Sequence, residues 1–317
     1  MSNSQTLVTL FDSIHKIYDK YHKQQKPTET IVISVLFHEC LPCVIDYIKN
    51  TFFYFKNYNI KILISCNELM NSLIQHLLNN QLTNISNHVI IVNSRPNDMP
   101  IWGNVNLFEQ HILNYMYCKN NDVNFDYFWF SASNDIFIKD IDLEYMKDNI
   151  VSKANLTRQT MVKKDIDIFY NTFISNPNLC GWFKRMLLDK NTVTTLYNNN
   201  IVIKCNEMEG LVLDKDIANE AFDFYINNLY QKSSFKEYLM EEIFLPSYLF
   251  SFYNYKYETF TMREKWCKYD DLKNKHNEEL YNSVLKNHKM LFCIKSVDRN
   301  YNNAIRSIVR NKIALLI

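Results

Sequence analysis

An acidic residue stands directly after the most hydrophobic stretch of this chain. Residues 126–130 read DYFWF and are aromatic enough to predict a buried β-strand. Residues 131–134 are small and polar, and Asp135 follows them. Since Ser, Asn and Asp favour turns, one interpretation is a simple turn between two strands. The other is a binding site, because open α/β sheets bind their ligands at the carboxyl ends of strands.

Other acidic residues stand in positions suited to chemistry. Glu209 precedes one of only three glycines in the chain, so it is either a turn residue or a ligand for a hydroxyl group. Glu241 and Glu242 lie inside the apolar segment 238–245 (YLMEEIFL), which leaves little room for both carboxylates to face water. A carboxylate in such a setting can act as a general base. Two solvated acids on a helix are the alternative.

Three basic residues near the C-terminus are candidates for binding an anion. Arg263 and Lys265 precede Trp266, and Lys295 follows the apolar residues 291–294 (LFCI). Fixed cations in a dry pocket stabilise negative charge that develops on a leaving group. Solvated surface bases are the alternative for each of the three.

The composition argues against several classes of protein. Of the 317 residues, 47% are hydrophobic, which is enough for a substantial core. The 35 basic and 34 acidic residues leave a net charge of +1, so nucleic acid is not expected as a partner. With only three glycines the chain has no glycine-rich phosphate-binding loop, which leaves the P-loop and dinucleotide-binding motifs without support.

The cysteines and the apolar segments indicate the environment. Of eight cysteines only Cys40 and Cys43 are close together, and a single CxxC without partner ligands is weak evidence for zinc. We therefore expect no metal site and reduced thiols. The N-terminal residues 1–25 mix both charges, and no stretch approaches the roughly 20 apolar residues of a membrane span. These features predict a soluble, cytoplasmic protein.

The order of elements predicts an α/β fold with a mostly parallel central sheet flanked by helices, because apolar strands alternate with helical patterns. The expected strands are 31–37, 60–65, 88–92 and 126–130, and the expected helices between them are 43–56, 68–80 and 105–118. Further along we expect two short strands within 201–213, helices over 215–230 and 235–252, and aromatic strands in 253–317. We predict one domain over 31–317, preceded by a helical extension over 1–30.

Several of these segments, taken in order, resemble the core-2/I-branching type of glycosyltransferase. This family includes β-1,6-N-acetylglucosaminyltransferases and peptide xylosyltransferases. The matching segments are 37–39 (FHE), 102–103 (WG), 131–138 (SASNDIFI), 209–213 (EGLVL), 240–247 (MEEIFLPS) and 292–295 (FCIK). The resemblance runs from about residue 31 to about residue 298. The chain departs from the family pattern at Asn67, where the family has Asp, and in 131–138, which lack the family's Gly and Pro.

The resemblance implies a GT-A fold, a Rossmann-like sandwich that binds a UDP-sugar, and an inverting transfer of N-acetylglucosamine or xylose to a hydroxyl group of a glycan or glycoprotein. It assigns a role to each candidate residue. The general base is Glu242, with Glu241 as the alternative, and the donor diphosphate is bound by Arg263, Lys265 and Lys295. The donor and acceptor sugars are contacted by Asp135 and Glu209. Trp102 either stacks on a sugar ring or packs in the core, and His38 either approaches the nucleotide or caps a strand.

The resemblance also implies that no cofactor is needed, since basic residues neutralise the diphosphate in place of a metal ion. The segment 133–135 (SND) offers a single carboxylate where most GT-A enzymes have Asp-x-Asp, which makes it a poor site for a hard cation. Two alternatives stay open. In one, Asp135 and a distant acid bind Mn²⁺ or Mg²⁺; in the other, the chain is a non-catalytic glycan-binding or structural relative. For an enzyme we expect a bacterial-type or viral origin, with action in the host cytoplasm if it is viral.

Overall fold

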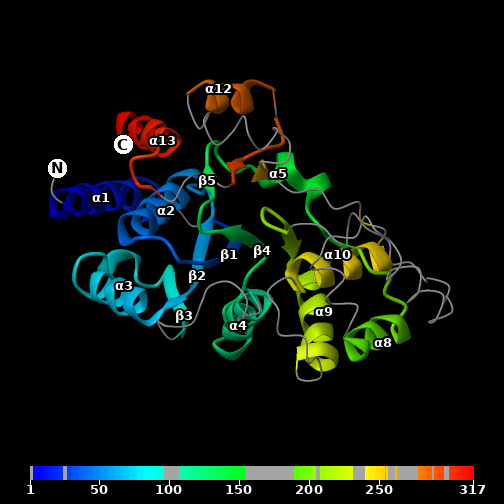
Figure 1. The fold of residues 1–317 in the computed structure, drawn as a ribbon. Coiled ribbons are helices and arrows are strands. Elements are labelled where there is room, and N and C mark those ends of the chain that lie inside the picture. The colour runs from blue at the N-terminus through cyan, green and yellow to red at the C-terminus, as the bar shows by residue number, and fades with distance from the viewer. Residues whose placement is uncertain are drawn as a thin grey trace.

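The computed structural model describes residues 3–23, 27–95, 107–153, 189–204, 208–230, 240–253, 255, 261–262, 278–287, 289–295 and 300–317. Within these residues a five-stranded sheet lies between two groups of helices (Figure 1). The strands are β1 (Thr30–Leu36), β2 (Asn59–Asn67), β3 (Val89–Arg95), β4 (Tyr127–Ala132) and β6 (Val212–Asp214). Their order is β3-β2-β1-β4-β6; β6 runs antiparallel to β4, and the other neighbours are parallel. The predicted α/β fold class is confirmed.

The strand order creates a switch point between β1 and β4. From β1 the chain moves outward to β2 and β3, and then returns to place β4 on the other side of β1. At such a point the connections that follow the two strands leave in opposite directions, and a crevice opens at the carboxyl edge. The register pairs Leu36 with Ala132. The segments that begin at Phe37 and Ser133 therefore start from adjacent positions at this edge of the sheet.

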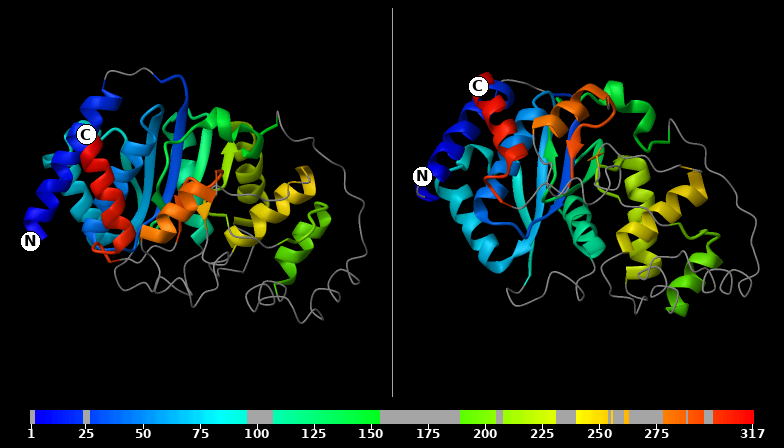
Figure 2. Two further views of the ribbon diagram at one scale, coloured as in Figure 1. Left: turned by 90° about the horizontal axis from the view of Figure 1, so that it is seen from above. Right: turned by 45° about the horizontal axis from the view of Figure 1, so that its top comes forward.

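The two faces of the sheet are covered by different helices, and the alternation of side chains explains how (Figure 2). Ile31, Ile33 and Trp129 belong to one buried cluster, whereas Val32 and Phe128 belong to the other. The first cluster includes side chains of α1 (Asn3–Ile17), α2 (Leu41–Tyr54), α3 (Glu68–Asn80), α12 (Glu278–Asn287) and α13 (Ala304–Leu316). The second includes side chains of α4 (Leu107–Asn120), α8 (Lys190–Asn198), α9 (Lys215–Tyr225) and α10 (Met240–Tyr253). Since successive side chains on a strand point to opposite faces, the apolar strands supply both cores.

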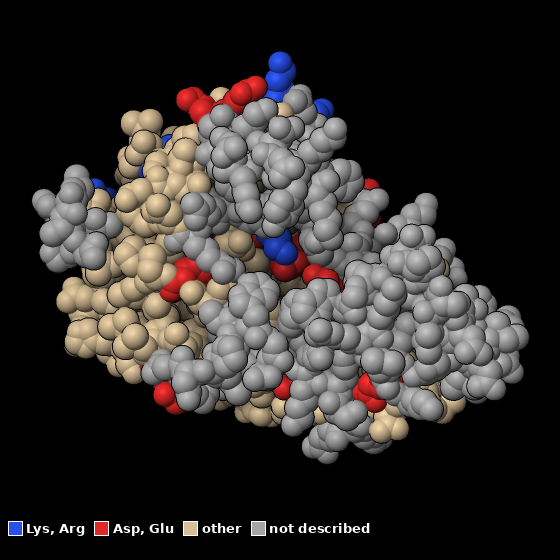
Figure 3. Space-filling view, in the orientation of Figure 1, with Lys and Arg blue, Asp and Glu red and all other residues tan. Residues whose placement is uncertain are grey.

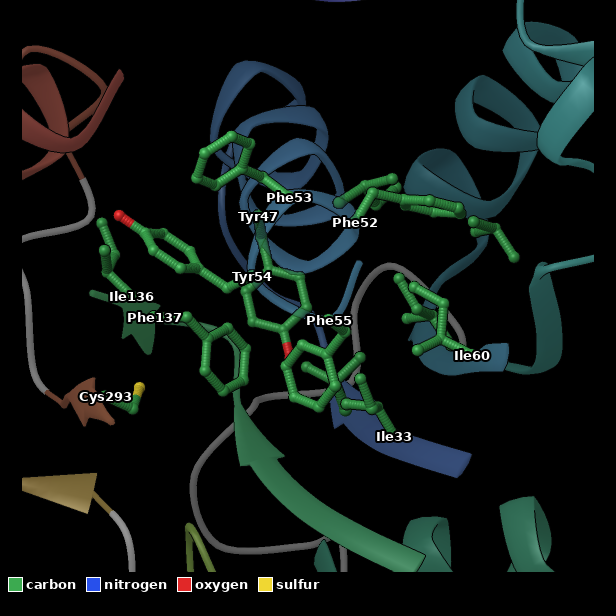
Figure 4. Packing of buried hydrophobic residues seen from close by; sticks show 14 of the residues in the cluster. Ile33, Tyr47, Phe52, Phe53, Tyr54, Phe55, Ile60, Ile136, Phe137 and Cys293 are labelled. Atoms are coloured by element: carbon green, nitrogen blue, oxygen red, sulfur yellow. The ribbon is translucent and has the colours of Figure 1, made fainter. Parts of the chain in front are cut away.

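A small second sheet lies beyond the carboxyl edge of β4. It contains β5 (Ile136–Phe137), β8 (Cys293–Ile294) and β7 (Thr261–Met262), with β8 in the middle. Asn50 of α2 holds β5 in place: its side-chain amide donates to Phe137 O at 2.9 Å and its carbonyl accepts from Phe137 N at 2.8 Å. The rings of Tyr47 and Phe55 pack against Phe137 in the same region (Figure 4). These contacts fix the strand that follows Asp135.

The two ends of the described chain lie side by side. Helix α13 lies next to α1 in all three ribbon views (Figures 1 and 2), and Lys20 Nζ donates to Leu316 O at 2.7 Å. Leu10, Ile14 and Ile17 of α1 are buried in the same cluster as α2. Helix α1 thus contributes side chains to the core of the first face.

Two expectations about local structure are wrong. Residues 201–204 form no strand, because their backbone is bonded to side chains of α10: Val202 N donates to Ser251 Oγ at 2.7 Å and Lys204 N donates to Ser247 Oγ at 2.8 Å. The C-terminal region also contains two helices, α12 and α13, where we expected mainly strands. Their apolar residues recur at helical spacing and pack against the first face, and this packing decides the structure.

Short elements complete the described chain. They are a π-helical turn at Tyr18–His22, a 3-10 turn at Thr83–Ile85, helix α5 at Leu143–Met146, a 3-10 turn at Lys147–Asn149 and a π-helical turn at Ile226–Tyr230. In the part of the chain that the structure describes, no helix has both the length and the apolar character needed to cross a bilayer.

The Asn50→Ala substitution tests the clamp on β5. Asn50 is 3% exposed, so its loss leaves a buried donor and a buried acceptor of Phe137 without partners. We expect the free energy of unfolding to fall by about 2–4 kcal/mol, measured by urea denaturation. Asn80, whose side chain also bonds to a backbone carbonyl but is exposed, is the matched control; Asn80→Ala should change stability by less than about 0.5 kcal/mol. Equal effects at both sites would contradict the clamp.

Candidate functional site

Asp135 closes the turn that follows β4. Its backbone N–H donates to Ala132 O at 3.0 Å, and its Oδ2 accepts from Ala132 N at 2.8 Å and from Ser131 Oγ at 2.9 Å. The side chain is buried, and Oδ1 has no hydrogen-bond partner among the described residues. The residue is therefore a turn former through Oδ2, while Oδ1 leaves one buried acceptor position open. The turn interpretation of Asp135 is confirmed, and the binding-site interpretation stays a prediction.

Helix α2 supports this turn through a chain of hydroxyl groups. Tyr47 Oη donates to Ser131 Oγ at 2.7 Å, and Ser131 Oγ donates in turn to Asp135 Oδ2. Burial raises the pKa of Tyr47 well above its ordinary value, with the bond to Ser131 opposing the shift, so the phenol stays protonated and remains a donor. The chain fixes the direction in which the Asp135 carboxyl points.

Lys295 and Glu209 join Asp135 from two distant segments. The ladder between β5 and β8 pairs Ile136 with Ile294, so the next positions, Asp135 and Lys295, stand opposite each other. Lys295 Nζ lies 2.5 Å from Glu209 Oε1, and both side chains are mostly buried, with 17% and 23% exposed. We call Asp135, Glu209 and Lys295 the acid–lysine cluster. Three residues singled out from the sequence thus lie close together at the carboxyl edge of β4.

A glycine turn sets the position of Glu209. Gly210 has a φ of 78°, a conformation that costs other residues strain, and its N–H donates to Phe130 O at 2.8 Å. Phe130 N donates back to Leu211 O at 3.0 Å. This exchange attaches the turn to the end of β4, and Glu209 is held next to it.

The cluster changes the protonation of Asp135. Burial raises the pKa of its carboxyl to about 7, because the charged form loses its hydration. The positive charge of Lys295 and the Ala132 N–H oppose this shift, and the negative charge of Glu209 adds to it. Asp135 is therefore partly protonated at neutral pH. A proton on this carboxyl lowers the negative charge at the edge of the sheet.

A buried histidine on the second face belongs to the same surroundings, although sequence reasoning missed it. His111 of α4 forms a 2.7 Å hydrogen bond between Nδ1 and Ser34 Oγ, and Asn114 Nδ2 donates to the same Ser34 oxygen at 2.8 Å. Burial lowers the pKa of His111 to about 4, with an opposing contribution from Glu209. His111 is therefore neutral at physiological pH. Its signal in the sequence was its spacing, three residues after Phe108 and four residues before Tyr115, which are both buried.

A second acidic residue, Glu39, lies at the carboxyl edge of β1 and was also missed. Its Oε1 accepts from Ser133 Oγ at 2.6 Å, and its Oε2 accepts from His38 N at 3.1 Å. His38 Nε2 lies 3.7 Å from Glu39 Oε1, so the histidine that we proposed for the nucleotide sits beside this carboxylate. Glu39 is buried and links the ends of β1 and β4 across the switch point. Its position directly after the first strand was the available signal.

The predicted general base lies in the first turn of α10. Glu242 is partly buried, and Phe244 in the same turn packs on Phe108 at the start of α4, with ring centroids 5.7 Å apart. Helix α4 is the next described element after β3, so this contact brings the start of α10 towards the carboxyl side of the sheet. The role of Glu242 stays a prediction. The remaining candidates lie outside the described residues: Trp102, Arg263, Lys265 and the side chain of Glu241.

The surface above this edge is recessed. In the space-filling view, basic and acidic atoms lie next to each other at the bottom of a hollow near the middle of the face (Figure 3). Within the described ranges, no group of three or more His, Cys, Asp or Glu side chains has an arrangement that could hold a metal ion. The chemistry at hand is thus that of one ammonium group, one carboxylate and one carboxyl group with a raised pKa.

No model of a known protein family matches this chain, and no curated protein matches it.

Asp135→Asn should alter the dependence of stability on pH. The folded pKa of about 7 lies above the roughly 3.9 of an unfolded aspartate, so the protonated carboxyl stabilises the fold fully below about pH 4. This contribution is lost as the pH rises through 7. The wild type should therefore lose up to about 4 kcal/mol relative to the variant between pH 4 and pH 8, since each pKa unit corresponds to about 1.4 kcal/mol.

Urea denaturation of both proteins at several pH values measures this difference. The same substitution at the surface residue Asp140, which pairs with Lys56, controls for the loss of any carboxylate. If the difference between wild type and Asp135→Asn stays constant from pH 4 to pH 8, the raised pKa of Asp135 is contradicted.

Proposed function

We propose that this chain is an inverting glycosyltransferase that acts in the cytoplasm. It transfers N-acetylglucosamine or xylose from a UDP-sugar to a hydroxyl group of a glycan or glycoprotein, without a metal ion. The observation that supports this most strongly is the convergence of Asp135, Glu209 and Lys295 at the carboxyl edge of β4, beside the switch point. These residues were chosen from three segments far apart in the sequence. The described cysteines form no disulfide with one another, which suits a reducing compartment.

Lys295 is suited to the diphosphate of the donor. It is mostly buried and faces carboxyl groups, so its ammonium group is held in a fixed position with little water around it. A diphosphate carries more negative charge than one carboxylate and competes with Glu209 for the lysine. In a partly dry site, such a fixed cation stabilises the negative charge that develops on the leaving UDP.

Glu209 is suited to the sugar hydroxyl groups once Lys295 binds phosphate. A carboxylate accepts hydrogen bonds from hydroxyl groups, and charge-assisted bonds of this kind are short and strong. The glycine turn keeps Glu209 at the end of β4 whether or not a ligand is present. The residue therefore serves as a preorganised acceptor at the place where donor and acceptor sugars meet.

The raised pKa of Asp135 is compatible with an anionic ligand. An ionised carboxylate beside a diphosphate repels it, whereas a protonated carboxyl group donates a hydrogen bond to an oxygen atom of the ligand. A bound anion near Lys295 raises the pKa of Asp135 further, because negative charge disfavours ionisation. Asp135 then contributes a polar contact to the sugar or phosphate without adding charge.

Glu242 is the proposed base. An inverting transfer needs a carboxylate that removes the proton of the attacking hydroxyl group on the side opposite the leaving group. Glu242 lies on a different helix from the three residues of the acid–lysine cluster, and its side chain is partly buried among apolar neighbours. Glu241 is the alternative base.

A second candidate function is a non-catalytic relative that binds glycans. The observation in its favour is the hydrogen bonding of Asn67, a residue that stands where the family has Asp at the end of a strand. Here Asn67 caps α3, with its Oδ1 accepting from Met70 N at 2.8 Å. That side chain is engaged in holding a helix, and Asn and Asp cap helices equally well. The position at which the family has Asp thus has a structural role in this chain.

The Glu242→Gln variant tests the base directly. UDP release from UDP-N-acetylglucosamine and UDP-xylose is followed with the purified protein in the presence of a hydroxyl acceptor. We expect turnover to fall at least about 100-fold in Glu242→Gln, while UDP affinity, measured by calorimetry, stays unchanged. Glu241→Gln is the matched control, since it makes the same change one residue earlier and should keep most of the activity.

The same assay with and without EDTA separates the alternatives. Turnover that persists in EDTA supports the metal-independent mechanism. Loss of turnover in EDTA supports the metal-dependent alternative. UDP binding without any turnover favours the non-catalytic relative. No turnover and no UDP binding would exclude the transferase altogether.

Lys295→Gln tests the diphosphate contact. A charge-assisted hydrogen bond contributes about 1.5–3 kcal/mol, so UDP affinity should fall about 10- to 100-fold, measured by calorimetry. Lys295→Arg keeps the charge and should retain most of the affinity, which separates lost binding from a disturbed fold. Lys289→Gln, at an exposed lysine nearby in sequence, is the control and should bind UDP like the wild type. Unchanged affinity in Lys295→Gln would remove this residue from the donor site.

A further inference from the structure

Two cysteines at the start of α2 lie within reach of each other. Cys40 is the N-cap residue of the helix, with an extended backbone (φ −68°, ψ 154°), and Pro42 lies in the first turn. Cys43 N donates to Cys40 O at 2.9 Å, which folds the turn so that the two sulfur atoms stand 3.5 Å apart. The S–S bond of a disulfide is about 2.05 Å long. The two thiols thus need to approach by only about 1.5 Å, a distance that side-chain rotation covers.

The two thiols differ in exposure. Cys40 is exposed, whereas Cys43 is fully buried. An external disulfide therefore reaches Cys40 first, and Cys43 stands behind it, where it can attack only the sulfur of Cys40. This division into an accessible attacking thiol and a sheltered resolving thiol is what a stepwise disulfide exchange requires.

The surroundings support the same division. Burial raises the pKa of Cys43 to about 12, while the buried guanidinium of Arg306 acts to lower it. Cys43 is therefore a thiol until a neighbour removes its proton. Cys40 is the thiol of the pair that is open to solvent. The attack on an external disulfide thus begins at Cys40.

Other described thiols do not share this arrangement. Cys66, Cys118 and Cys293 are buried, and none of the three forms a disulfide with another described cysteine. Burial raises the pKa of Cys118 to about 12, which keeps it in the unreactive thiol form. Among the described cysteines the pair at 40 and 43 alone combines an exposed thiol with a second sulfur in contact.

We propose that Cys40 and Cys43 form a redox-active dithiol, which closes to a disulfide by exchange with a low-molecular-weight or protein disulfide. The Cys40 thiolate attacks one sulfur of the external disulfide, whose S–S bond breaks and releases one thiol. Cys43 then gives up its proton and attacks the Cys40 sulfur, which releases the second thiol. Two cysteine thiols are oxidised by two electrons in total, and the external disulfide is reduced to two thiols.

This inference does not depend on the proposed sugar transfer. It does concern the same edge of the sheet, because Cys40 directly follows Glu39, whose carboxylate binds Ser133. The dithiol therefore stands at the start of α2, one residue away from the link between β1 and β4.

Peptide mass spectrometry of the folded protein after exposure to oxidised glutathione tests the dithiol. Tryptic cleavage gives the peptide 24–49, which contains Cys40 and Cys43 and no other cysteine. After acid quenching and alkylation we expect this peptide without alkyl groups and about 2 Da lighter than its reduced form, since two hydrogen atoms are lost. Treatment with dithiothreitol should restore two alkylation sites. The peptide 62–119, which holds the buried Cys66 and Cys118, should stay reduced in the same digest.

Two variants identify the order of the steps. Cys43→Ser should stop at a stable glutathione adduct on Cys40, because the resolving thiol is missing. Cys40→Ser should carry no adduct on Cys43, because that thiol is buried. A wild-type protein that keeps glutathione on Cys40, or whose peptide 24–49 stays fully reduced at concentrations that form the adduct in Cys43→Ser, would overturn the proposal.

Discussion

The parallel pairing of β1 with β4 is the constraint on which the site depends. It places the ends of two strands that are nearly 100 residues apart in the sequence next to each other, with Leu36 opposite Ala132. Glu39 and Ser133 then form a hydrogen bond across the switch point. The turn that contains Asp135 begins at a fixed position, directly after the end of β4. The short ladder between β5 and β8 adds Lys295 to this arrangement. Asp135 and Lys295 thus owe their positions to strand pairing, and the glycine turn attached to β4 positions Glu209.

Electrostatics shapes the site as much as geometry does. A lysine and two acidic side chains are mostly removed from water, which costs hydration free energy for each charged group. The ion pair between Glu209 and Lys295 offsets part of this cost, and Asp135 reduces it further because its pKa rises to about 7. The acid–lysine cluster therefore carries a net charge between 0 and −1 near neutral pH. Such a site accepts an anion more readily than one with two ionised carboxylates.

Helix α2 connects the main features of the first face. Its Tyr47 supports the turn of Asp135 through Ser131, its Asn50 holds β5, and its first turn carries the two close thiols. Because α2 packs on both α1 and α13, the two ends of the described chain also stabilise it. Helix α2 is therefore joined to the end of β4 and to the Asp135 turn by direct hydrogen bonds.

The sequence by itself determined the α/β class and most of the elements, because apolar runs and helical periodicity are local properties. Helix α3 begins and ends at the predicted residues, and β1, β2 and β4 lie where aromatic or β-branched residues follow one another. It also identified Asp135, Glu209 and Lys295 as separate candidates. Only the tertiary structure decided that these three meet, that His111 and Glu39 join their surroundings, and that 201–204 bond to α10 instead of forming a strand. The reason is physical. Contacts between distant segments depend on strand order and register, which no local pattern encodes, and the pKa of Asp135 depends on burial that exists only in the folded chain.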